Sequence, residues 1–144
     1  MSELRKTVFD FLDSHKKAVF ATVDQDHRPH TNLMLYAMDD NLNIYFGTRR
    51  SFGKYSRILQ NPQISISVVE EKIDPLRTVD IHGKAEEVPE ADTLATLAYL
   101  KGKNLSKYYV QGEADFVMFK VTPAMIRYQD ATLGELAIQH LDLT

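Results

Sequence analysis

The spacing of apolar residues predicts a chain built mainly of β-strands, with a few short helices. Apolar and polar side chains alternate as in a strand with one buried face, most clearly at Ile64, Ile66 and Val68. Strands are predicted over residues 18–24, 30–38, 42–46, 63–69, 78–88 and 116–121, with an extension over 125–128. Apolar residues three and four positions apart predict helices over residues 1–15, 51–60 and 90–100. The tail from residue 133 shows only weak helical periodicity.

Short polar turns connect these strands, which favours antiparallel neighbours. Segments 25–29 and 39–41 are of hairpin length, whereas parallel strands need longer crossovers. The sequence has no GxGxxG motif and no regular βα alternation, so a Rossmann fold is not expected. We therefore predict a mainly β (α+β) fold, a small antiparallel barrel with short flanking helices. All 144 residues are expected to form a single domain.

The strand over residues 30–38 is predicted to have one plain and one unusual face. One set of alternating residues is apolar, and the other set is neither fully polar nor fully apolar. A mixed face of this kind is expected where a strand touches something other than plain water. The predicted core side consists of Leu33, Leu35 and Ala37, and the mixed side of Asn32, Met34 and Tyr36.

Composition narrows the function classes. The chain has no cysteine, which removes disulfides, thiolate metal sites and cysteine nucleophiles. Its net charge is −3 with the charges interspersed, so nucleic acid is not an expected partner. No apolar run approaches the length of a membrane span, and residues 1–17 lack the apolar core of a secretory signal. We expect a cytoplasmic protein with no membrane partner.

Candidate chemistry is concentrated in residues 47–54, where a predicted strand ends and a helix begins. A helix N-terminus attracts anions through free N–H groups and the helix dipole. Arg49, Arg50 and Lys54 add positive charge there, and Ser51 lies three residues before Lys54, on the same predicted helix face. The segment therefore fits a phosphate site. It equally fits a solvated basic turn capped by serine.

The order PHTNLMLYAMDD, IYFGT and GKYSRILQNPQISISV resembles the FMN-binding split β-barrel of the pyridoxamine 5′-phosphate oxidase-like family. The resemblance covers about residues 18–88 and continues more loosely to residue 128. Its most specific parts are Thr48 at a strand end, Lys54 six residues later, and Asn61-Pro62 before the next strand. The arginine–histidine substrate motif of the true oxidase has no counterpart in residues 134–144, so the chain does not resemble the vitamin B6 enzyme itself.

The resemblance implies FMN as cofactor, a homodimer with the flavin between subunits, and a small-molecule substrate. It places the flavin ring along residues 32–37 and the phosphate near Thr48 and Lys54. The family's arginines are replaced by Asn32 and Gly53, and its glutamine by Thr78, while Arg49, Arg50 and Ser51 supply charge and a hydroxyl nearby. The cofactor-binding residues predicted in this way are Asn32, Leu33, Met34, Tyr36, Gly47, Thr48, Arg49, Ser51, Lys54 and Thr78.

No catalytic side chain is assigned, and no metal is predicted. His27 and His30 have the spacing of a metal pair, but they lie on a hairpin turn without an evident third ligand. His82 fits a residue on the face of the barrel. No Ser–His–Asp arrangement can be identified, and in a flavin enzyme the cofactor itself supplies the redox chemistry.

Three functions remain open on the sequence. The first is an FMN-dependent oxidoreductase acting on a small molecule. The second is a non-enzymatic flavin carrier or sensor. The third is a haem- or deazaflavin-binding member of the same barrel superfamily.

Overall fold

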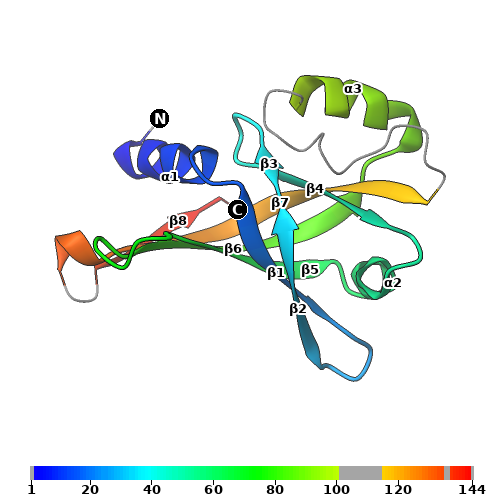
Figure 1. Cartoon of the computed structure of the whole chain (residues 1–144), viewed down its shortest axis with the longest axis horizontal. Helices are drawn as coiled ribbons and strands as arrows, with labels where there is room; N and C mark the ends of the chain where they lie inside the picture. Colours follow the sequence, from blue (N-terminus) through cyan, green and yellow to red (C-terminus); the bar gives the residue numbers. More distant parts are fainter. Residues whose placement is uncertain (1, 101–114, 135–136, 144) are drawn as a thin grey trace.

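The computed structural model describes residues 2–100, 115–134 and 137–143 (Figure 1). The first half of the chain contains α1 (Glu3–Asp13), β1 (Lys17–Val23), β2 (Pro29–Leu35), β3 (Ala37–Met38), β4 (Ile44–Arg49) and α2 (Gly53–Gln60). The second half contains β5 (Gln63–Val69), β6 (Arg77–Glu87), α3 (Glu90–Leu100), β7 (Phe116–Asp130), a 3-10 turn (Ala131–Leu133) and β8 (Ile138–Asp142). No helix in these residues is long and apolar enough to cross a membrane.

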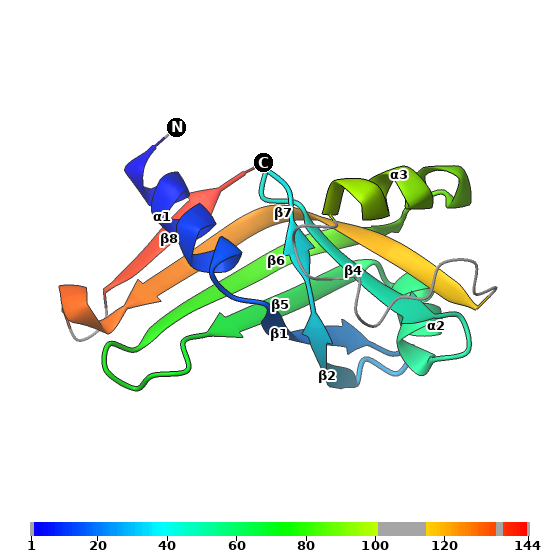
Figure 2. The ribbon, with the colours of Figure 1, turned by 45° about the horizontal axis from the view of Figure 1, so that its top comes forward.

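The strands form one strongly curled antiparallel sheet (Figures 1 and 2). Their order is β2-β1-β5-β6-β7-β4-β3, with β8 added to β7. The two ends of this order are joined in sequence, because β2 leads directly into β3, yet β2 pairs with β1 while β3 pairs with β4. The fold is therefore a split β-barrel with short helices, as the sequence predicts.

The core lies on the concave side of the sheet and is built from alternate residues of each strand. Along β5 the buried residues are Ile64, Ile66 and Val68, which confirms the period of two read from the sequence. Aromatic rings fill the centre, where Phe46 lies 4.7 Å from Phe20 between ring centroids. Apolar burial of this kind is the main stabilising term of such a barrel.

Helix α1 packs against one end of the core, and α2 lies toward the other end (Figures 1 and 2). The predicted apolar stripe of α1 is confirmed, since Val8, Phe11 and Leu12 are buried. The hydroxyl of Tyr36 donates a hydrogen bond of 2.6 Å to the carbonyl of Leu12. This bond ties α1 to the short link between β2 and β3.

The predicted faces of residues 30–38 are wrong for most of the strand, although Ala37 is buried as predicted. Leu33 is 69% exposed, whereas Tyr36 is only 3% exposed and belongs to the core. The cause is the register with β1, where Asn32 lies opposite Phe20 and Met34 lies opposite Ala18. Directly opposed residues share one face of a sheet, so the buried partners on β1 turn the even-numbered positions of β2 inward.

The C-terminal tail also differs from expectation. Residues from 133 onward were expected to show at most weak helix, but Ile138–Asp142 forms β8. The reason is the length of β7, which continues through the predicted extension to Asp130 and offers a free edge for pairing. Pairing with an existing edge satisfies the backbone groups of a short segment that has little helical propensity of its own.

Candidate functional site

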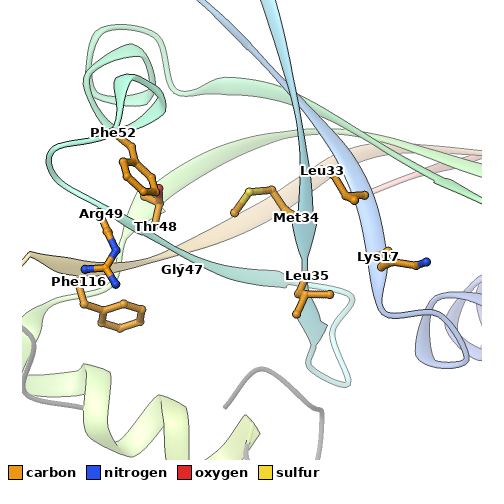
Figure 3. A pocket seen from close by; sticks show the side chains of 9 residues that line it. All are labelled: Lys17, Leu33, Met34, Leu35, Gly47, Thr48, Arg49, Phe52 and Phe116. Carbon is orange, nitrogen blue, oxygen red and sulfur yellow. The ribbon is translucent and has the colours of Figure 1, made fainter. Parts of the chain in front are cut away.

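A cavity of about 440 Å³ opens where the barrel fails to close, between β2 and β4 (Figure 3). Met34 points from β2 across this cavity toward Thr48 and Phe52, as Figure 3 shows. Most lining side chains are apolar, and two, Lys17 and Arg49, are cationic. The lining residues are Lys17, Leu33, Met34, Leu35, Gly47, Thr48, Arg49, Phe52 and Phe116.

The β2 wall of the cavity also presents backbone hydrogen-bonding groups. The N–H of Tyr36 donates to the carbonyl of Lys16 at 3.1 Å, which makes residues 16 and 36 a hydrogen-bonded pair. Bonded and non-bonded pairs alternate along an antiparallel ladder. The N–H and C=O groups of Leu33 and Leu35 therefore point away from β1, toward the open edge of the sheet.

A second cavity, of about 500 Å³, adjoins the first and shares Phe52 with it. Its lining is polar and includes the start of α2, whose first N–H groups and positive dipole end favour an anion. The lining residues are His30, Thr31, Asn32, Ser51, Phe52, Gly53, Lys54 and Arg57. An apolar slot and a basic polar site thus lie side by side.

Lys54 stands between the two cavities. Its ammonium group lies 3.2 Å from the sulfur of Met34 and 5.6 Å from the ring centroid of Phe52. It has no carboxylate partner in the described part of the chain. Burial, together with the nearby charge of Arg57, lowers the pKa of Lys54. An anion bound here would supply the missing negative charge.

Arg57 contributes a second cation that the sequence analysis missed. Its Nε donates to the hydroxyl of Thr22 at 2.8 Å, which leaves the rest of the guanidinium at the polar cavity. A Cβ at position 53 would lie only 2.8 Å from a terminal nitrogen of Arg57, so Gly53 leaves room for this arrangement. Arg57, one helical turn later, thus supplies the positive charge that the family has at position 53. The spacing of residues 54 and 57 indicates this in the sequence, because it places both side chains on one face of the helix.

Thr48 carries a buried polar atom that lacks a partner. The residue is 5% exposed, and its hydroxyl makes no hydrogen bond within the described residues. An unpaired buried hydroxyl costs about 1–3 kcal/mol of stability. Because Thr48 also lines the apolar cavity, its hydroxyl is available to a ligand after a change of side-chain rotamer.

Ser51 does not share a helix face with Lys54, so that prediction is wrong. Helix α2 begins at Gly53 with Phe52 as its N-cap residue, and Ser51 precedes it. The Ser51 hydroxyl donates to Asp115 at 2.6 Å, and its backbone N–H donates to the same carboxylate. Arg50 donates to Glu87 and to the carbonyl of Phe116. Both residues therefore hold the loop before α2 in place.

The structure brings eight of the ten predicted binding residues to the two cavities. Leu33, Met34, Gly47, Thr48 and Arg49 line the apolar cavity, while Asn32, Ser51 and Lys54 line the polar one. Tyr36 lies in the core. Thr78 lies on β6 beside Val69 and Gln129, and it shares the outer face of the sheet with Asp80 and His82. The lining residues that the sequence analysis did not predict are Lys17, His30, Thr31, Leu35, Phe52, Gly53, Arg57 and Phe116.

His30 pairs with a carboxylate of its own hairpin. His30 Nε2 lies 2.9 Å from Asp24 Oδ2, and hydrogen bonds from His30 and the backbone of Arg28 hold the pKa of the Asp24 carboxyl well below its usual range. Asp24 also accepts bonds from the N–H groups of Asp26 and Arg28, so it organises the turn. No cluster of three or more potential metal ligands occurs within residues 2–100, 115–134 and 137–143.

The family model for pyridoxamine 5′-phosphate oxidase matches residues 4–130, nearly the whole chain. The chain belongs to this family. No curated protein matches it. The family assignment agrees with the split barrel and with the residues that carry the resemblance in the sequence.

Solved structures of several differently named proteins share the fold of this chain. One is general stress protein 26 from Bacillus anthracis, with 18% identity over 99% of this chain and 100% of that chain, and a TM-score of 0.73. Another is an FAD-binding protein from Mesorhizobium loti, with 20% identity over 88% and 90% and a TM-score of 0.66. A haem storage protein from Vibrio cholerae has 19% identity over 85% and 91% and a TM-score of 0.66. At these identities the likeness establishes the fold alone.

The unpaired hydroxyl of Thr48 generates a prediction about stability. Thr48→Val removes a buried group without a partner and keeps the shape of the side chain, so it should raise the free energy of unfolding of the ligand-free protein by about 1–3 kcal/mol. Thr22→Val is the matched control, because Thr22 is equally buried but accepts a hydrogen bond from Arg57. It should destabilise the protein in the same urea titration. Destabilisation by both variants would mean that Thr48 is already paired.

Proposed function

We propose that this protein binds FMN, with the flavin ring in the apolar cavity and the phosphate in the polar cavity, and acts as a flavin-dependent oxidoreductase on a small molecule. The observation that carries this proposal is the position of Lys54. Its half-buried ammonium lacks a carboxylate partner in the described chain and stands where an apolar slot meets a basic site. A ligand that joins a flat, largely apolar ring to a phosphate matches that combination.

The apolar cavity suits the two unlike ends of a flavin ring. Met34, Leu35 and Phe116 offer apolar contact for the dimethylbenzene part. The pyrimidine part needs hydrogen-bond donors and acceptors, and the outward backbone groups of Leu33 and Leu35 provide both at the edge of β2. A ligand lying along this edge would occupy the place that a further strand would otherwise take.

The polar cavity suits the phosphate. Lys54 and Arg57 supply two positive charges, and the first N–H groups of α2 supply uncharged donors. Asn32 lines the same cavity from β2 and adds an amide. A single anion at this place would restore charge balance around Lys54 and satisfy donors from both elements.

Bound flavin supplies the hydride or electron transfer, and the residues of this chain position it and keep water away from one face. Haem is the alternative ligand, favoured by the haem storage protein that shares the fold. The apolar cavity favours flavin, because none of its lining residues is a histidine, cysteine or tyrosine, and the sulfur of its methionine contacts Lys54. We expect the protein to act in the cytoplasm, and turnover with reduced nicotinamide distinguishes an oxidoreductase from a flavin carrier.

The absorption spectrum of the purified protein tests the proposed ligand. We expect the two flavin bands in the near-ultraviolet and the blue, and release of FMN on denaturation at about one per chain, as one site in each chain requires. A sharp Soret band would assign the site to haem. A colourless protein that takes up no added FMN would rule out the proposal.

Removing the charge of Lys54 should weaken FMN binding. Lys54→Met loses a charge-assisted hydrogen bond to phosphate worth about 1.5–3 kcal/mol, or about ten- to a hundredfold in affinity, measured by quenching of flavin fluorescence. Riboflavin, which lacks the phosphate, should bind both proteins equally. Because the pKa of Lys54 is lowered from 10.5, FMN affinity should fall as the pH rises toward that value and the ammonium loses its charge.

Lys6→Met is the control for this loss of charge. Lys6 lies on α1, is largely exposed and pairs with Asp10, so its replacement should leave FMN affinity unchanged. Equal weakening by both variants would assign the effect to net charge and move the phosphate away from Lys54.

We further propose that the protein is a homodimer in which the second copy covers the flavin. Leu33 on the cavity rim is 69% exposed and lies opposite Val19, which is 42% exposed. Val19 in turn borders a hollow of about 410 Å³ on the outer face of the sheet. A two-fold axis beside this apolar pair buries it in both copies. It also lays the outer face of one copy, which carries Thr78, over the cavity of the other.

Leu33→Asp tests this arrangement, because it places a charge at the centre of the proposed contact. Burying an unpaired carboxylate is costly, so the variant should be monomeric by light scattering at micromolar concentration and should hold FMN more weakly. Ile73→Asp, at an even more exposed apolar residue, should stay dimeric. A monomeric wild-type protein with FMN fully bound would contradict the shared site.

A further inference from the structure

Met34 is the side chain that connects the two halves of the site. Its thioether extends from β2 across the apolar cavity (Figure 3), and its sulfur accepts a hydrogen bond of 3.2 Å from the ammonium of Lys54. Met34 is half-buried, whereas Met38 and Met118 are buried. Met125 is also half-buried, but it lies at the hollow on the outer face of the sheet and not at this cavity. Peroxide entering the cavity therefore reaches this sulfur, beside the cation on which the phosphate depends.

We propose that Met34 is an oxidation site through which hydrogen peroxide weakens the hold of Lys54 on the phosphate of its ligand. The step converts the thioether into a sulfoxide. One oxygen of the peroxide bonds to sulfur, the O–O bond breaks, and the other oxygen leaves as water. Sulfur loses two electrons and peroxide gains them, and no proton is consumed overall. The product is reversible by methionine sulfoxide reductases.

Lys54 has a part in the reaction itself. The departing oxygen of peroxide accumulates negative charge as the O–O bond breaks, and a hydrogen-bond donor beside it stabilises that charge. The ammonium of Lys54 lies at the sulfur, and by turning from the sulfur to the departing oxygen it becomes such a donor and frees the sulfur lone pair to attack. Met34 is therefore expected to oxidise faster in the wild-type protein than in Lys54→Met.

Oxidation of Met34 affects phosphate binding because it changes the hydrogen-bond acceptor that faces Lys54. A thioether sulfur is a weak hydrogen-bond acceptor, so the ammonium leaves it readily for a phosphate. A sulfoxide oxygen is polar and accepts strongly, and it forms where the ammonium already lies. Oxidised Met34 therefore competes with the phosphate for Lys54. This inference rests on the proposed flavin site and adds a redox control to it.

The experiment uses flavin-free, full-length protein treated with hydrogen peroxide. Peptide mass mapping follows Met34 in the wild-type protein, in Lys54→Met and in the control Lys6→Met, with buried Met38 as the unreactive reference. The dissociation constants of FMN and riboflavin are then measured before treatment, after it, and after incubation with methionine sulfoxide reductases. Met34→Leu undergoes the same treatment as the variant without the reactive sulfur.

We expect Met34 to oxidise before Met38 and more slowly in Lys54→Met than in Lys6→Met. FMN affinity should then fall about tenfold, the effect of losing one charge-assisted hydrogen bond, and the reductases should restore it. Riboflavin affinity should fall less than FMN affinity, because riboflavin loses only part of its ring contact with Met34, and peroxide should leave FMN binding by Met34→Leu unaltered.

Two results would overturn the inference while leaving the proposed function intact. One is unchanged FMN affinity in protein whose Met34 is fully oxidised. The other is an equal loss for FMN and riboflavin, which would mean that the sulfoxide only obstructs the ring cavity. Untreated protein that binds neither flavin would overturn the proposed function, and the inference with it.

Discussion

The shape of the site depends on how Tyr36 is anchored. This residue alone separates β2 from β3, and so carries the chain from one edge of the sheet to the other. Its ring is buried, its hydroxyl donates to Leu12, and its N–H donates to Lys16. Burial raises the pKa of the Tyr36 phenol, so it stays a donor even in alkaline solution. With this point fixed, the two edges meet at Tyr36 and stay apart beyond it, where the cavity opens.

An unclosed barrel leaves polar groups without their usual partners at the split. Several arginines elsewhere pair with carboxylates, as Arg50 does with Glu87 and Arg127 with Asp80. Lys54 and Arg57 have none in the described chain, and both lie at the polar cavity beside the apolar one, which Thr48 with its unpaired hydroxyl lines. Native proteins seldom leave buried polar groups unpaired. The concentration of such groups at the split therefore indicates a ligand more strongly than any one of them does.

Much of this could be predicted from the sequence, because strand periodicity and hairpin turns are local signals. The buried faces of β5 and β6 follow directly from alternation. The faces of β2 could not be predicted, since they depend on pairing with Phe20 and Ala18, and a strand with mixed residues does not specify its own register. Thr48 and Lys54 were recognisable because they flank one strand–helix junction. Phe116 comes from a strand more than sixty residues away, and only the pairing of β7 with β4 brings it to the cavity.

The contacts that Lys54 makes without ligand explain how its side chain keeps its position when no anion is bound. A thioether sulfur and an aromatic face each stabilise an ammonium weakly, the aromatic face by about 0.5–1 kcal/mol where it is exposed. They hold the side chain between the cavities without neutralising its charge. A carboxylate at the same place would bind the ammonium more firmly and compete with any phosphate. The uncharged neighbours Met34 and Phe52 therefore keep Lys54 in position and available to an anion. Because the sulfur of Met34 can be oxidised, this availability is also sensitive to oxidation.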